Sequence, residues 1–265
     1  MATAPPSALE RAVRHDRALV ALGIGAITLL SWLYLMRMAA TMSAMAEDEA
    51  MHAAMGMPAM ATWGAAELVT LFLMWAVMMV AMMVPSATPM ILTFATVNRV
   101  RRAQQRPFVS TGVFLAGYVA VWGAFSLAAA LAQGGLHGAS LLVPGTSSAV
   151  LYVGGALLLA AGVFQWSRLK YVCLTQCRTP ANFLASEWRD GTGGALVMGL
   201  RHGVYCLGCC WLLMALLFVL GVMNLLWVAA LAAFVLAEKV APGGVWISRV
   251  TGVVLAAWGV WVIAG

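Results

Sequence analysis

The densest group of potential metal ligands lies in one apolar run, residues 195–220. His202, Cys206 and Cys209 fall within an arc of about 60° if this run is a helix, and Cys210 lies next to that arc. Three thiols and an imidazole can form a trigonal or tetrahedral site for Cu(I) or Zn(II). Buried free cysteine is also a common small apolar residue, so single thiols at these positions would not require a metal. The combination with His202 favours a metal site.

A second pair of thiols, Cys173 and Cys177, lies in a segment rich in Lys and Arg. Their spacing fits either a metal clip or a redox pair, but a zinc knuckle would need a second Cys pair nearby. A permanent disulfide is not expected, because the positive charges predict that this segment faces the reducing cytoplasm.

A methionine stripe marks the second apolar run. Met74, Met78 and Met82 share one helical face with Glu67, which lies near the outer end of the run. Thioethers so aligned can relay a soft ion, although methionine also commonly fills helix interfaces. Glu67 is the less ordinary residue, since ionisable groups in membrane segments are usually functional or paired.

A further methionine-rich segment follows the first apolar run, over residues 36–60. Its candidate ligands are Met51, His52, Met55 and Met57. Thioethers keep their binding ability in an oxidising compartment and select Cu(I) over harder ions. The alternative is an amphipathic segment lying on the bilayer. Leu and Ile are absent from this stretch, which favours ligands over a generic apolar surface.

The composition shows what must position these residues. The chain has 265 residues, of which 63% are hydrophobic and 9% charged. Soluble domains are about 45–50% apolar and about 25% charged, so a soluble globule, a coiled coil and a disordered chain are excluded. The net charge of +6 comes from short Arg clusters between apolar runs, a pattern that sets membrane topology and implies no nucleic-acid partner.

We therefore predict an all-α, polytopic transmembrane bundle of about seven helices, or six if the first is cleaved after Ala46. The second helix is expected to be kinked or ended at Pro85. The predicted helices are residues 18–36, 65–84, 111–133, 148–166, 195–220, 223–237 and 245–264.

The distribution of Lys and Arg predicts the topology. Residues 1–17 form a cytoplasmic amino-terminal segment, 37–64 an outward Met-rich loop, and 65–265 a six-helix membrane domain with a cytoplasmic Cys-containing loop at 167–193. The carboxyl terminus faces outward. We interpret the adjacent Glu238 and Lys239 at a helix end as a topology anchor.

Several of these segments together resemble an uncharacterised bacterial family of predicted metal-binding integral membrane proteins, domain of unknown function 2182. The resemblance covers roughly residues 65–242. It rests on these segments: Trp75 to Met90, Lys170 to Pro180, Gly199 to Met214, Met223-Asn224 and Glu238-Lys239. It implies a multi-helix protein of the bacterial inner membrane with a metal site, and supplies no reaction or ligand set. The outer Met-rich segment resembles those of copper uptake proteins in composition only.

The residues thus predict a copper-binding membrane protein that acts in uptake, transfer or loading of a membrane metalloenzyme. Cu(I) is the expected metal, and zinc the alternative. Expected partners are membrane lipid and a membrane metalloenzyme or periplasmic metal-binding protein. An intramembrane thiol oxidoreductase and a structural subunit of a larger complex are the alternatives. Hydrolase chemistry lacks a Ser-His-Asp or paired-carboxylate pattern, so we expect no enzyme activity of that class.

Overall fold

The computed structural model describes residues 8–54, 64–105, 109–138, 148–222 and 224–264; the side chains at 8–16, 45–54, 137–138 and 148–151 lie outside that description. Within these ranges all regular elements are helices. The all-α prediction is therefore confirmed. The helices are α1 (Ala8–Ala54), α2 (Ala65–Ala103), α3 (Thr111–Gly138), α4 (Ser148–Phe164), α5 (Arg168–Arg178), α6 (Pro180–Glu187), α7 (Gly191–Ala215), α8 (Leu217–Leu220), α9 (Leu225–Val240) and α10 (Gly244–Ala264).

Five of the described helical segments are long and apolar enough to cross a membrane: residues 17–44, 65–103, 111–136, 191–220 and 244–264. The remaining two predicted spans correspond to short helices. Helix α4 has 17 residues and ends at Phe164 before a turn. Helix α9 has 16 residues, starting after its N-cap Asn224 and stopping before Pro242. A span of the hydrocarbon core takes about 20 residues, so both fall below that length.

Two helices run further than the sequence predicts. Helix α1 continues through Ala54, so residues 37–54 are helical where we expected a loop. Ala, Met and Glu are strong helix formers, and the segment contains no Gly or Pro before Gly56. Helix α2 continues through Pro85 and Pro89 to Ala103. Prolines are tolerated within membrane helices, and α2 remains helical through both of them.

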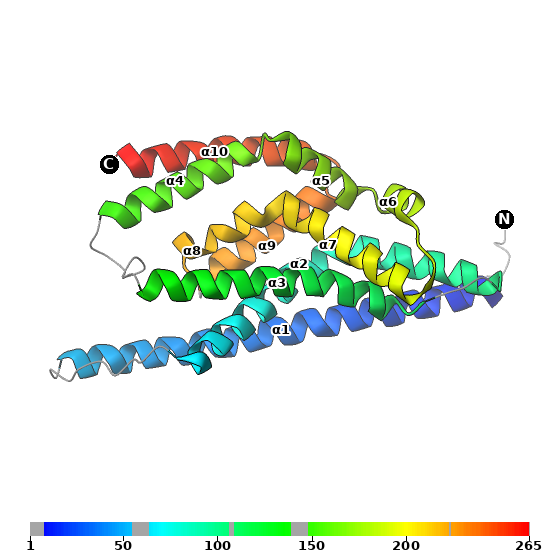
Figure 1. Ribbon diagram of the computed structural model, residues 1–265, viewed down its shortest axis with the longest axis horizontal. Helices are drawn as coiled ribbons and strands as arrows, with labels where there is room; N and C mark the ends of the chain where they lie inside the picture. Colours follow the sequence, from blue (N-terminus) through cyan, green and yellow to red (C-terminus); the bar gives the residue numbers. More distant parts are fainter. Residues whose placement is uncertain (1–7, 55–63, 106–108, 139–147, 223, 265) are drawn as a thin grey trace, which may run out of the picture.

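Helix α2 forms the centre of the bundle and packs against α1, α3 and α9, while α3 packs along α7 (Figure 1). Helices α3 and α7 approach closely where Gly117 faces the α7 backbone and Gly199 faces Phe114. Helices α4 and α10 form a separate pair on the other side of α7 and α9 (Figure 1). Gly155 and Gly162 of α4 contact α10. These small residues therefore lie in helix contacts within the chain.

The predicted cytoplasmic loop at 167–193 contains two short helices, α5 and α6. Ser167 caps α5 by accepting a hydrogen bond from the Lys170 amide at 3.1 Å. One face of α5 is buried, with Lys170, Cys173, Leu174 and Cys177, and the helix packs against α7 and α9. The thiols of this segment are thus placed on a rigid element beside the membrane bundle.

Candidate metal centre

Five buried cysteines gather where α5 meets α7, and we call them the thiol cluster. They are Cys173 and Cys177 of α5, and Cys206, Cys209 and Cys210 of α7; none of them forms a disulfide. Gly208 makes the contact possible, because a Cβ at this position would lie 2.7 Å from the Cys173 sulfur. Gly203 allows a similar approach on the α3 side, where a Cβ would lie 2.9 Å from Val121. Both glycines therefore allow a neighbouring helix to approach α7 closely.

The thiols contact one another across the helix pair. Cys177 lies in hydrogen-bonding contact with Cys206 and Cys209; these bonds and its burial raise the pKa of the Cys177 thiol well above the ordinary 9.0. Burial, with a smaller effect of Cys209, also raises the pKa of Cys173. Cys209 and Cys210 each donate to the Cys206 carbonyl at 3.0 Å. The cysteines of the cluster are therefore bonded to one another.

Cys206 is at the centre of a polar network that joins four helices. The ammonium group of Lys239 in α9 donates to the Cys206 sulfur at 2.9 Å and to the Ser86 hydroxyl of α2 at 2.9 Å. The Tyr118 hydroxyl of α3 lies 3.1 Å from the same sulfur and donates to the Met83 carbonyl at 3.0 Å. A metal ion at this sulfur would therefore compete with the contacts to Lys239 and Tyr118.

A buried ion pair fixes α5 beside this network. The Lys170 ammonium donates to both carboxylate oxygens of Glu238, at 2.8 and 2.9 Å, and both side chains are 1% exposed. Ser248 of α10 donates to the same carboxylate at 2.5 Å, and Arg178 donates to the Glu238 carbonyl. The interpretation of Glu238 and Lys239 as a topology anchor is wrong, because both are buried and each is bonded to another helix.

His202 lies one turn before Cys206, and its imidazole is buried in an aromatic setting. Its ring stacks with Tyr118 at 5.6 Å between centroids and contacts Phe183 edge-on at 5.5 Å. Its Nδ1 atom has no hydrogen-bond partner among the described residues. A buried nitrogen without a partner is costly, which makes His202 available as a metal ligand at low additional cost. The neighbouring Arg201, by contrast, is exposed and pairs with Glu187.

The methionine stripe of α2 is buried, with Met74, Met78 and Met82 each 1% exposed. Met82 precedes Ser86 by one helical turn, about 6 Å along the axis, and Ser86 shares Lys239 with Cys206. The stripe therefore leads toward the thiol cluster. Glu67 at its far end is exposed and caps its own helix, accepting from the Gly64 amide at 2.8 Å.

The outer candidate ligands are not placed near the cluster by any described contact. Met51 and His52 lie in the helical part of α1, where side chains are outside the description, and Met55 and Met57 lie outside the described residues. Among the described side chains, no group of three or more His, Cys, Asp or Glu is already arranged to hold a metal ion. Binding at the thiol cluster thus requires its side chains to rotate.

The chain matches a known protein family. The family model of PpoB2, described as a copper chaperone, matches residues 72–262. The chain belongs to this family. The match begins in α2 and ends in α10, so it includes the methionine stripe and the thiol cluster and excludes the outer Met-rich segment. It supports the prediction that the chain belongs to a metal-related family. Searches of curated proteins and of solved structures found no match.

Sequence reasoning missed the roles of four residues that complete the centre: Tyr118, Ser86, Lys170 and Lys239. Nothing in the local pattern distinguishes Tyr118 from other aromatic residues in the third run. A usable indication existed for Lys239 and Glu238, since charged residues within a few positions of an apolar run are expensive unless paired.

Proposed function

We propose that this protein is an integral membrane copper chaperone that takes Cu(I) as its cargo, holds it at the thiol cluster and passes it to a copper-using partner. The observation that carries the proposal is the meeting of thiols from α5 and α7 in one buried contact. Thiolates are soft ligands that select Cu(I) over Mg(II), Ca(II) and other hard ions. Membership in a copper chaperone family supports the choice of copper over zinc.

The donor set is suited to a cargo that must leave again. Cys206, Cys177 and Cys209 supply sulfur from two helices, and His202 supplies a nitrogen one turn away. Because the Cys206 sulfur accepts a hydrogen bond from Lys239, the ammonium group competes with the ion for that sulfur. Release of copper then leaves the Cys206 sulfur bonded to Lys239 instead of unsatisfied.

The methionine stripe supplies the approach to this site. Thioethers bind Cu(I) more weakly than thiolates, so an ion passing along Met74, Met78 and Met82 gains affinity as it nears the cluster. The Met-rich outer segment would collect the ion first, with Met51, His52, Met55 and Met57 as its ligands. Transfer of this kind runs downhill and depends on the partner, since the sequence has no nucleotide-binding motif.

The test is the copper content of the protein purified in detergent and loaded with Cu(I) under reducing, oxygen-free conditions. The triple variant Cys206→Ser/Cys209→Ser/Cys210→Ser is expected to lose the stoichiometric copper that the wild-type chain retains after desalting, as measured by plasma mass spectrometry. The control is Met198→Leu/Met214→Leu, which removes two buried sulfurs of the same helix outside the cluster. Unchanged copper in the cysteine variant would refute the proposal.

A further inference from the structure

A pocket separate from the thiol cluster opens where α4 ends and α5 and α10 begin. It has a volume of about 240 Å³ and is lined by residues of α5, of α10 and of the turn between α4 and α5. This is smaller than the roughly 300–1,000 Å³ of pockets for drug-sized ligands. The pocket therefore suits a small polar group.

The lining is basic. Arg168 and Arg249 line it and are exposed, and Lys170 lies at its base, bonded to Glu238. Among the described residues, neither arginine has an acidic partner. The N-terminal ends of α5 and α10 add partial positive charge, which the C-terminal end of α4 offsets in part. The electrostatics favour an anion.

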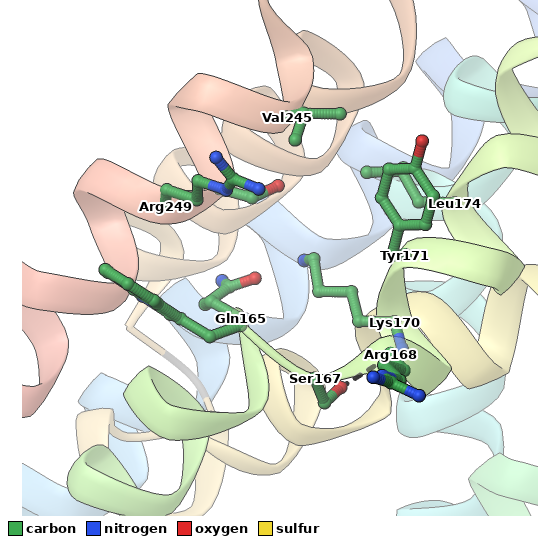
Figure 2. A pocket seen from close by; sticks show the side chains of 10 residues that line it. Gln165, Ser167, Arg168, Lys170, Tyr171, Leu174, Val245 and Arg249 are labelled. Carbon is green, nitrogen blue, oxygen red and sulfur yellow. Dashed lines mark hydrogen bonds between the residues drawn. The ribbon is translucent and has the colours of Figure 1, made fainter.

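Gln165 gives a second and independent indication of a ligand. Its side chain is only 5% exposed, yet neither its amide nitrogen nor its amide oxygen has a hydrogen-bond partner among the described residues. Figure 2 shows the amide in the middle of the pocket, between Arg249 and Lys170. Leaving a buried polar group unsatisfied costs about 1–3 kcal/mol. An oxygen-rich group in the pocket would accept a hydrogen bond from the amide nitrogen and remove the cost of leaving that nitrogen unsatisfied.

The rim matches the boundary between lipid and water. Trp166, Tyr171 and Trp246 are 61%, 57% and 69% exposed, and the Arg249 guanidinium lies 5.7 Å from the centroid of the Trp246 ring. Exposed Trp and Tyr beside arginine are typical of the interfacial zone of a membrane protein. The pocket also lies at the ends of the apolar helices α4 and α10, where lipid headgroups are found.

We propose that this pocket binds a phosphate group, which Arg249 and Arg168 hold from the rim and the Gln165 amide holds from below. The chemistry is the same for the headgroup phosphate of an anionic membrane lipid and for free phosphate. Arginine is well suited to either, because its planar fork can donate two hydrogen bonds to one phosphate. The site is independent of the copper function.

The test uses the full chain in detergent and native mass spectrometry. The probes are phosphatidylglycerol, inorganic phosphate, and diacylglycerol as a lipid without phosphate. Variants Arg249→Gln and Gln165→Leu are expected to weaken binding about tenfold, because each removes a hydrogen bond, charge-assisted in the case of Arg249. The matched control Arg189→Gln, an exposed arginine outside the pocket, should bind as the wild-type chain does.

The outcomes separate the two sources. Selective retention of phosphatidylglycerol supports a lipid headgroup, and retention of inorganic phosphate supports the free anion. The proposal is overturned if diacylglycerol binds as well as phosphatidylglycerol, if no probe binds, or if the two pocket variants bind as tightly as the control. Gln165→Leu should fold at least as well as wild type, because it removes an unsatisfied buried amide, and thermal unfolding without added probe checks this.

Discussion

The buried pair of Lys170 and Glu238 gives the sharpest test of how the centre is held together. Both side chains are 1% exposed, so solvent screens neither charge. Lys170→Met leaves the Glu238 carboxylate buried with only the Ser248 hydroxyl as a hydrogen-bond donor to it. Removing one partner of a buried ion pair costs about 3–5 kcal/mol. We therefore expect the free energy of unfolding of Lys170→Met to fall by that amount.

A double variant distinguishes two contributions to this loss of stability: the loss of the ion pair and the burial of an unpaired carboxylate. In Lys170→Met/Glu238→Gln the carboxylate is gone, while the amide oxygen can still accept from Ser248. The double variant should regain at least about 2 kcal/mol of the loss, because replacing both members of a buried pair is often close to neutral. The control Arg168→Met lies two residues earlier on the exposed face of α5, and its effect should stay within about 0.5 kcal/mol.

The assay is reversible unfolding by sodium dodecyl sulfate in mixed micelles, followed by tryptophan fluorescence. The same samples are loaded with Cu(I), because α5 carries Cys173 and Cys177. Loosening of α5 should lower copper retention in Lys170→Met and restore it in the double variant. A loss below about 1 kcal/mol in Lys170→Met, or no recovery in the double variant, would refute the view that this pair anchors α5.

Three further outcomes are expected. Gly208→Ala should lower the free energy of unfolding by about 1–3 kcal/mol, since the new methyl group meets the Cys173 sulfur at 2.7 Å. Adding Cys173→Ala should restore the stability. An equal loss with and without Cys173→Ala would contradict this contact. The pKa values of Cys173 and Cys177 are raised above 9.0, so less of the reactive thiolate is present at neutral pH. Alkylation of both residues by iodoacetamide, measured by peptide mass spectrometry, should therefore become rapid only above pH 9. Fast labelling of the folded protein at pH 7 would be inconsistent with these raised pKa values. His202→Leu should leave the stability unchanged or raise it, because it removes the unpartnered Nδ1. The same variant should bind Cu(I) more weakly in a competition titration with a chromogenic chelator. A Cu(I) affinity equal to that of the wild-type chain would remove His202 from the ligand set.

Much of the fold could be predicted from the sequence because long apolar runs indicate membrane helices. The all-α class and the approximate places of α2, α3, α7 and α10 were predictable in this way. The extension of α1 was missed because the apolar run ends before Arg37, whereas the residues that follow are good helix formers. The continuation of α2 past Pro85 was missed because a proline was taken to kink or end the helix, whereas membrane helices tolerate proline.

The site was predictable only where its residues share a helix. His202, Cys206 and Cys209 fall on one side of α7 by periodicity alone, and the structure buries all of them. The approach of Cys177 to Cys206 and the bond from Lys239 to Cys206 depend on how α5, α7 and α9 pack. No local pattern in the sequence carries that information. The role of the outer methionines stays a prediction.

The central claim is that Cu(I) binds to cysteine sulfur inside the bundle, and X-ray absorption spectroscopy of the copper-loaded protein tests it most directly. The account predicts a first shell of sulfur around Cu(I) that persists when Met74, Met78 and Met82 are changed to leucine and disappears when Cys206, Cys209 and Cys210 are changed to serine. A shell of nitrogen and oxygen alone in the wild-type protein, or a sulfur shell unaltered by loss of the three cysteines, would contradict the account.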